Sequence, residues 1–148
     1  DVPVSPWVED NLKDVLRICR SELAVEVAEV ERQLIALLDR YTFLPAGEDK
    51  RRPILAGNSV HADWWLARKF MPKFIGRLHY RHLDVTALKL QWQDWRGGPA
   101  FEKDDPETMR TYSPGTLAGL DSGRHDAHYD VQASIAELNF YRHALLAK

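Results

Sequence analysis

The sequence predicts an α/β domain in which helices outnumber strands. Most of the chain carries apolar residues at spacings of three and four, the period of an amphipathic helix. Two short segments predict strands: one ends in Ile54-Leu55 just before a Gly-Asn-Ser turn and is expected to be buried, and the other spans residues 78–85. Two strands are too few to bury helices on both faces of a sheet. Further strands are therefore expected from upstream sequence, from another chain, or from segments assigned here to helix.

Length, charge and cysteine content limit the class of protein. The chain has 148 residues, and we expect one domain over residues 1–148 with a core of its own. A net charge of −2 predicts no broad basic surface for long DNA or RNA, so any nucleic-acid contact should be short and local. The single cysteine, Cys19, excludes an intrachain disulfide and fits a reducing compartment inside the cell. No apolar run reaches membrane-spanning length, and no signal peptide is visible.

The first part of the chain predicts two helices. Residues 1–8 contain two prolines and predict an irregular lead-in, after which helical periodicity begins near Glu9. A second helix is predicted to start at Ser21 and to continue to Tyr41 with one apolar stripe. Residues 45–53 are then a polar connection into the first strand.

The second helix is rich in acidic residues, which raises the question of a metal site. Glu26, Glu29 and Glu31 are spread around the helix instead of sharing one side. We therefore expect all three carboxylates to be solvated.

The first strand leads into a compact turn that carries a carboxylate. Residues 57–59 (Gly-Asn-Ser) are turn formers, and a helix follows with Asp63 near its first turn and an end near Pro72. A carboxylate there lies at the carboxyl edge of a sheet, where α/β folds bind their ligands. The alternative is a plain turn in which Asp63 only stabilises the start of the helix.

The second half of the chain continues with a strand, a helix, a loop and a helix. Asp84 ends the second strand, and a helix through Leu88 and Trp92 follows. Residues 96–124 contain three prolines and little periodicity, which predicts a long loop or insertion. Residues 125–146 form the last predicted helix. Its predicted inner stripe consists of Val131, Ile135, Leu138, Tyr141 and Arg142.

The start of the last helix offers a base and a carboxylate. Five helical residues turn through about 500°, so His125 and Asp130 converge only if His125 lies on the incoming loop. Such a pair suits a general base beside a metal ligand. Other pairings remain open: Asp126 and Asp130 share a face, and His125 with His128 has a spacing that could bind Zn²⁺. The structural alternative is that Asp126 caps the helix and both histidines are surface residues.

Three blocks together resemble oligoribonuclease, a 3′-to-5′ exoribonuclease of the DEDDh group that degrades very short RNA. These are residues 56–63 (AGNSVHAD), residues 78–85 (LHYRHLDV), and His125 with Asp130 and residues 133–142 (ASIAELNFYR). They follow the order of the family. The resemblance implies a truncated RNase H-like exonuclease fold, mainly helical, with two or three strands remaining.

The resemblance also implies roles in two-metal hydrolysis. The family holds two divalent ions about 4 Å apart with four carboxylates, and a histidine activates the attacking water. By position, Asp63 is similar to the third carboxylate, Asp130 to the fourth, and His125 to the general base. The implied cofactor is Mg²⁺ or Mn²⁺, bound weakly or not at all by this chain alone.

A second set of positions resembles the family's site for the 5′ phosphate of a dinucleotide. Ser59, Arg81 and Thr86 match that site, and Tyr80 matches a residue that reaches it from the partner subunit of a dimer. A guanidinium and hydroxyls that hold a terminal phosphate select short substrates by length. The implied partners are short RNA or dinucleotides and a second copy in a homodimer or larger assembly, with neither membrane nor long DNA, in the cytoplasm or a mitochondrion.

The chain also departs from the family. The family's first two carboxylates form an Asp-x-Glu on a strand upstream of these helices, whereas the plain Asp-x-Glu here, residues 105–107, lies in the Pro/Gly loop. Because the sequence starts at Asp1 and not at Met, we expect that strand upstream. Asp126 and Tyr129 also differ from the usual residues, and residues 96–124 look longer than the family's connection. The alternative is an inactive relative that serves as a binding, dimerisation or assembly module.

Overall fold

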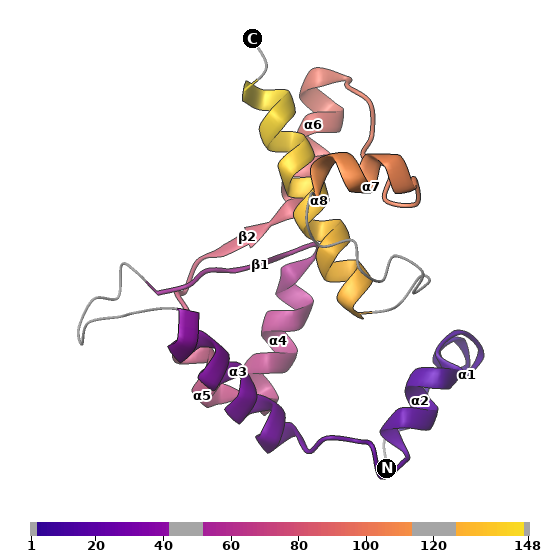
Figure 1. Cartoon of the computed structure of the whole chain (residues 1–148), viewed down its shortest axis with the longest axis vertical. Helices are drawn as coiled ribbons and strands as arrows, with labels where there is room; N and C mark the ends of the chain where they lie inside the picture. The colour runs from indigo at the N-terminus through magenta and orange to yellow at the C-terminus, as the bar shows by residue number, and fades with distance from the viewer. Residues whose placement is uncertain (1–2, 42–51, 114–126, 147–148) are drawn as a thin grey trace.

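The computed structural model describes residues 3–41, 52–113 and 127–146. These residues form mostly helices together with two strands, which confirms the predicted α/β class and its helical bias (Figure 1). The helices are α1 (Pro6–Asn11), α2 (Lys13–Cys19), α3 (Val27–Tyr41), α4 (Val60–Phe70), α5 (Pro72–Ile75), α6 (Val85–Arg96), α7 (Pro106–Tyr112) and α8 (Ala127–Leu146). The strands are β1 (Leu55–Gly57) and β2 (His82–Asp84).

The two strands pair in parallel and connect the rest of the described fold. Leu55 is opposite His82, and Gly57 is opposite Asp84. Both strands were predicted, although β2 is shorter than expected. Because the strands are parallel, their carboxyl ends meet at one edge of the sheet, and both α4 and α6 start there.

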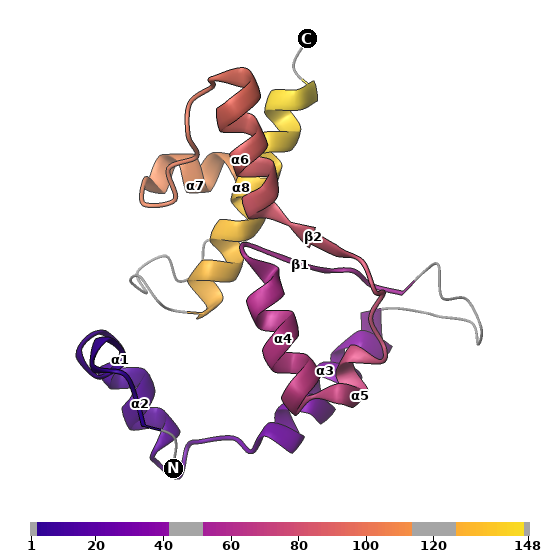
Figure 2. The ribbon, with the colours of Figure 1, turned by 180° about the vertical axis from the view of Figure 1, so that it is seen from behind.

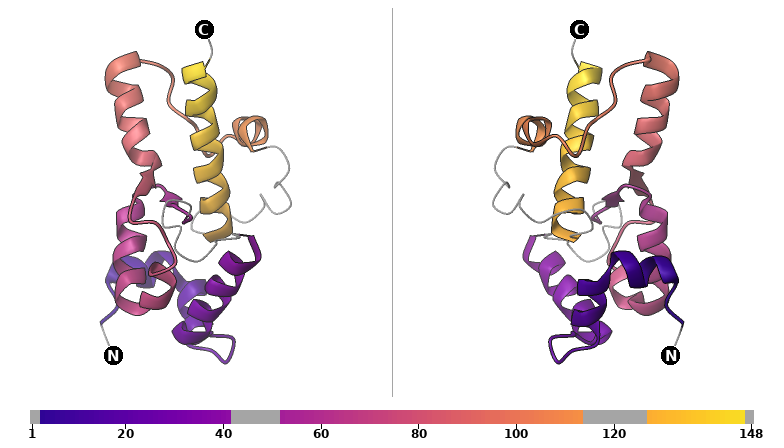
Figure 3. Two further views of the ribbon diagram at one scale, coloured as in Figure 1. Left: turned by 90° about the vertical axis from the view of Figure 1, so that its left-hand side faces the viewer. Right: turned by 90° about the vertical axis from the view of Figure 1, so that its right-hand side faces the viewer.

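Two separate hydrophobic clusters pack on either side of this junction. In the first, Ala67, Phe74 and Leu78 are buried against side chains of α3, and Figure 2 shows α3, α4 and α5 grouped on one side of the two strands. The second cluster joins α7 to α8. Figure 3 shows α6 and α8 running side by side, with α7 against α8. The buried members of the second cluster are Phe101, Met109, Ala133 and Ala136.

The helices α1 and α2 lie apart from the other described elements (Figures 1 and 2). Neither helix contains a buried residue. The irregular lead-in predicted for residues 1–8 is wrong from Pro6 on, because the Ser5 hydroxyl accepts from the Val8 amide and caps a helix that starts at Pro6.

The start predicted for the next helix at Ser21 is also wrong. The Ser21 amide donates to the Ile18 carbonyl, and the Leu23 amide donates to the Ser21 hydroxyl. Ser21 therefore closes a turn, and α3 begins at Val27.

One acidic residue of α3 is not solvated as predicted. Glu31 is 9% exposed, and its Oε1 accepts from the backbone amides of Lys73 at 2.7 Å and Phe74 at 3.1 Å. These amides open α5 and have no partner within that helix. Glu31 is thus a cap that a distant helix provides.

The segment predicted as a loop contains the helix α7. Asp105 caps it by accepting from the amides of Glu107 and Thr108, and Pro106 occupies its first turn. The hydrogen bonds from Thr108 lower the pKa of the Asp105 carboxyl. Residues 114–126, and with them the His125 and Asp126 predictions, lie outside the described residues.

The inner face of α8 differs from the predicted stripe. Tyr141 is buried as predicted, but Val131 is 56% and Ile135 is 45% exposed, whereas Ala133 and Ala136, which lie outside the stripe, are buried. Small side chains let the second cluster approach the α8 backbone closely, so the periodicity of the larger apolar residues indicated only part of the buried face. No described helix is long and apolar enough to cross a membrane.

Candidate functional site

The candidate site begins in the turn between β1 and α4. Ser59 has φ 51° and ψ 37°, the left-handed conformation that residues other than glycine rarely adopt. It occupies the N-cap position of α4, yet its hydroxyl makes no capping hydrogen bond to that helix. The hydroxyl is consequently available to other groups.

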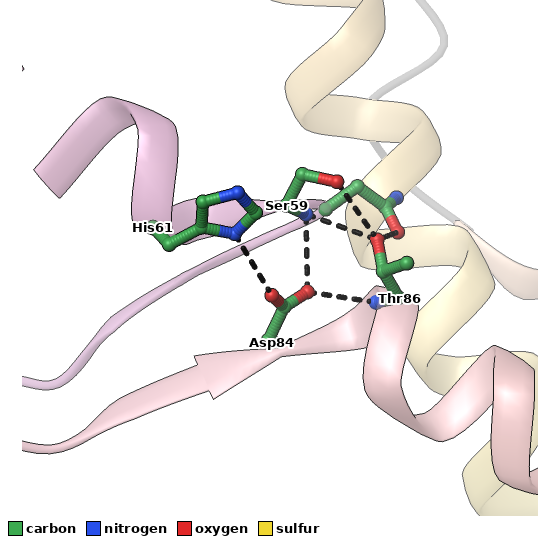
Figure 4. A network of polar contacts seen from close by, with 5 residues as sticks. Ser59, His61, Asp84 and Thr86 are labelled. Carbon is green, nitrogen blue, oxygen red and sulfur yellow. Dashed lines mark hydrogen bonds and ion pairs between the residues drawn. The ribbon is translucent and has the colours of Figure 1, made fainter. Parts of the chain in front are cut away.

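Asp84, the last residue of β2, holds this turn against the start of α6. Its Oδ1 accepts from the Ser59 amide at 3.0 Å and from the Thr86 amide at 2.9 Å (Figure 4). Its other oxygen, Oδ2, lies 3.7 Å from His61 Nδ1. One carboxylate therefore bridges the carboxyl ends of both strands.

Two hydroxyl groups meet at this bridge. Ser59 Oγ lies 3.4 Å from Thr86 Oγ1, and the Ser59 amide donates to Thr86 Oγ1 at 3.0 Å. The Thr86 hydroxyl in turn donates to Asn58 Oδ1 at 3.2 Å. The Ser59 side chain is exposed, so a ligand can reach this pair of hydroxyls.

Asn58 connects the turn to α8. Its Nδ2 donates to Glu137 Oε2 at 2.9 Å and to Ser134 Oγ at 3.2 Å. The other oxygen of Glu137 accepts from the Tyr141 hydroxyl at 2.9 Å, and Glu137 and Tyr141 are 6% and 2% exposed. Burial, reinforced by Glu137, raises the pKa of the Tyr141 phenol. The site is thus fixed to the buried side of α8.

The two predicted metal ligands lie in the first turns of two helices. Asp63 is exposed in α4, and Asp130 is exposed in α8 with its Oδ1 3.9 Å from Lys103 Nζ. Within residues 3–41, 52–113 and 127–146, no three His, Cys, Asp or Glu side chains are grouped so that they could hold a metal ion. Carboxylate oxygens suit Mg²⁺, but the two predicted ligands are too few for a pair of ions. The described residues alone therefore do not fit a two-metal centre.

The structure places Arg81 and Tyr80 away from the two hydroxyls. Arg81 directly precedes β2 and Thr86 follows it, so their side chains leave opposite ends of one strand. The Arg81 guanidinium lies 5.5 Å from the centre of the Tyr80 ring, which stacks on His79 at 4.5 Å. Tyr80 is 77% exposed. Of the four predicted phosphate-binding residues, Ser59 and Thr86 come together.

Sequence reasoning did not assign a site role to Asn58, Asp84 or Glu137. An Asp two residues before a Thr at a helix start indicates an N-cap, and Asp84 is one. That Asp84 also reaches Ser59 depends on the parallel register of β1 and β2, which the sequence does not display.

The fold and this geometry define a helix-rich α/β protein with a polar site at the carboxyl edge of parallel strands, the usual place for a ligand in such folds. No protein-family profile matches the chain. It is 35% identical over 131 residues to the oligoribonuclease of Francisella tularensis subsp. novicida, an alignment that covers 88% of this chain and 59% of that protein. It is 37% identical over 117 residues to the "Probable oligoribonuclease" of Schizosaccharomyces pombe, which covers 78% of this chain and 37% of the relative.

The chain is therefore an oligoribonuclease-like protein. It spans 59% of the length of the Francisella relative and less of the yeast one. Because the alignment with the Francisella protein covers 88% of this chain, it confirms the predicted resemblance to oligoribonuclease.

Proposed function

We propose that the chain acts in a 3′-to-5′ exoribonuclease of the DEDDh type, with an RNase H-like fold, that degrades short oligoribonucleotides. In this proposal it provides the third and fourth carboxylates, the general base and the site for a terminal phosphate. The first two carboxylates come from a further Asp-x-Glu segment. The observation that carries the proposal is the pair of hydroxyls, Ser59 Oγ and Thr86 Oγ1, joined 3.4 Å apart at the carboxyl edge of the strands.

The two hydroxyls support binding of the 5′ phosphate of a dinucleotide. Ser59 is exposed and its hydroxyl does not cap α4, so it can donate to a phosphate oxygen. The resemblance assigns the positive charge to Arg81. Because Arg81 leaves the opposite end of β2 from Thr86, this role requires its exposed side chain to extend along the strand towards the hydroxyls. Tyr80, 77% exposed, would then contact the site of a second subunit in a homodimer.

The proposed hydrolytic centre contains Asp63, Asp130 and His125. The two aspartates would hold Mg²⁺ or Mn²⁺ together with the Asp-x-Glu carboxylates, and the ions would activate water and stabilise the negative charge that develops on phosphate. His125 would take the proton from that water.

The test is hydrolysis of a dinucleotide by the protein as its gene encodes it. We expect Mn²⁺- or Mg²⁺-dependent release of mononucleotides. Asp63→Ala and His125→Ala should each lower the rate at least about 100-fold, in the range of losing a metal ligand or a general base. A gene product that carries an Asp-x-Glu strand and leaves dinucleotides intact would refute the proposal.

One observation favours a second candidate, an inactive relative that binds RNA or assembles with a partner. The described residues group fewer than three metal-binding side chains at any point. This candidate predicts that the 148 residues bind dinucleotides without cleaving them at any metal concentration. Metal-dependent cleavage by these residues that is lost in Asp63→Ala would exclude it.

A further inference from the structure

Asp84 occupies the centre of the candidate site without being a ligand for substrate or metal in the function proposed above. We propose that Asp84 is a positioning residue, which holds Ser59 in its left-handed conformation and so brings its hydroxyl and that of Thr86 to one point. The inference rests on the proposed function, because it gives this arrangement a purpose, namely preference for a 5′-phosphorylated end.

The first support for this positioning role is that Asp84 links two different elements. A single oxygen, Oδ1, accepts from the amides of Ser59 and Thr86, which belong to different elements and are 27 residues apart. The Thr86 bond alone is an ordinary N-cap of α6. The Ser59 bond does not help that helix. It fixes the turn after β1 instead.

The second support is the left-handed backbone conformation of Ser59. A left-handed residue other than glycine costs roughly 1–2 kcal/mol, so other contacts must compensate for it. The Ser59 amide has two acceptors, Asp84 Oδ1 and Thr86 Oγ1, each at 3.0 Å. In the left-handed state this amide points towards β2 and the α6 start. The hydroxyl then lies beside Thr86 Oγ1 (Figure 4).

The third support concerns which group at the site can still donate a hydrogen bond to a phosphate. Asp84 already accepts hydrogen bonds from the amides of Ser59 and Thr86, and Asn58 Oδ1 accepts one from the Thr86 hydroxyl. The Ser59 hydroxyl is then the donor in its 3.4 Å contact with Thr86 Oγ1, and it can turn this hydrogen to an incoming phosphate instead. Its placement depends on Asp84. The negative charge of Asp84 does not itself help an anion to bind. Its contribution is geometric.

Two substitutions of Asp84 separate the effect of its geometry from the effect of its charge. Asp84→Asn keeps an oxygen that can accept from both amides but removes the charge. Asp84→Ala removes both. The matched control is Asp105→Ala, because Asp105 caps α7 through two amides in the same way and lies away from the candidate site.

The experiment compares a 5′-phosphorylated dinucleotide with the same dinucleotide bearing a 5′ hydroxyl, bound to the full chain in EDTA so that cleavage is prevented. The readout is the dissociation constant of the 5′-hydroxyl dinucleotide divided by that of the 5′-phosphorylated dinucleotide, so a larger ratio means a stronger preference for the phosphate. We expect Asp84→Ala to lower the ratio about tenfold, the effect of losing one hydrogen bond to a charged group. Asp84→Asn should keep the wild-type ratio or raise it, and Asp105→Ala should leave it unchanged while losing thermal stability.

Backbone amide exchange of Ser59 and Thr86, measured by NMR, reads the positioning without any ligand. Both amides should be protected in the wild type and in Asp84→Asn, and exposed in Asp84→Ala. Equal exchange in the wild type and Asp84→Ala would overturn the positioning role, and so would an unchanged binding ratio in Asp84→Ala. Protected amides together with a wild-type ratio of one would instead overturn the proposed phosphate site and the purpose assigned here to Asp84.

Discussion

Ser59 combines an unfavourable backbone conformation with an exposed hydroxyl. Its left-handed φ of 51° is one that a serine side chain disfavours and glycine accepts freely. If the hydroxyl serves a ligand, the residue gives up stability for function. Two substitutions separate these effects, because alanine removes the hydroxyl and keeps the strain, whereas glycine removes both.

We predict that Ser59→Gly is about 0.5–1 kcal/mol more stable than Ser59→Ala. The relief of roughly 1–2 kcal/mol of left-handed strain exceeds the extra chain entropy of glycine. Both variants should lose preference for a 5′-phosphorylated dinucleotide to the same extent. Urea unfolding gives the free energies, and binding titrations give the preference. Equal stability of the two variants would show that the turn carries no strain.

At the scale of residues, the sequence indicated which residues lie at the candidate site better than it indicated their hydrogen-bond partners. It named Ser59 and Thr86 as candidate phosphate-binding residues through the resemblance, and Asp84 as a strand end, and the structure places the Ser59 and Thr86 hydroxyls 3.4 Å apart. The bond from the Ser59 amide to Asp84 depends on the register between two strands that are distant in the sequence. The buried pair Glu137 and Tyr141 was hidden for another reason, because a glutamate among helix formers ordinarily predicts a solvated side chain.

At the scale of elements, the contact between α3 and α5 depends on one buried carboxylate. Glu31 accepts from the amides of Lys73 and Phe74, and α5 has four residues. A helix this short cannot stabilise itself. Glu31 therefore holds the start of α5 in place while the apolar side chains of the first cluster pack beside it.

We predict that Glu31→Ala lowers the free energy of unfolding by about 1–3 kcal/mol, because it leaves the buried Phe74 amide and the part-buried Lys73 amide without their acceptor. Glu31→Gln keeps an oxygen in place and should cost less than half as much. Glu26→Ala removes an exposed acid of the same segment and should remain within about 0.5 kcal/mol of the wild type. Denaturant unfolding measures all three. A cost for Glu31→Ala no larger than that for Glu26→Ala would contradict the capping role.

Element positions were predicted well where apolar residues mark them and poorly where polar or small residues do. The strands, α4 and α6 follow from apolar runs and turn residues. The helix α7 was missed because its seven residues are mostly polar and lie within a Pro-rich segment, although Asp105-Pro106 is an N-cap followed by proline. The buried face of α8 was assigned only in part, because Ala133 and Ala136, which the periodicity of large apolar residues does not mark, pack against α7 together with Phe140.

At the scale of the whole molecule, the helical α/β class was predictable, but the contribution of each part to stability was not. Periodicity marks α2 as helical in the same way as the packed helices. In the structure α1 and α2 have no buried residue, and apolar side chains such as Val15 and Ile18 are 46% and 48% exposed. Amphipathic periodicity predicts a helix with an apolar face, but it does not tell what covers that face.

We therefore predict that deleting residues 1–24 changes the midpoint of thermal unfolding by less than about 2 °C, since no described side chain of α1 or α2 is buried in the rest of the fold. Removal of residues 133–148 is the contrasting change. It takes away Ala133, Ala136 and Tyr141, all buried, together with the glutamate that holds Asn58, and should abolish cooperative unfolding. Circular dichroism melting measures both truncations. A large loss of stability on removing residues 1–24 would mean that α1 and α2 pack against the rest of the chain in solution.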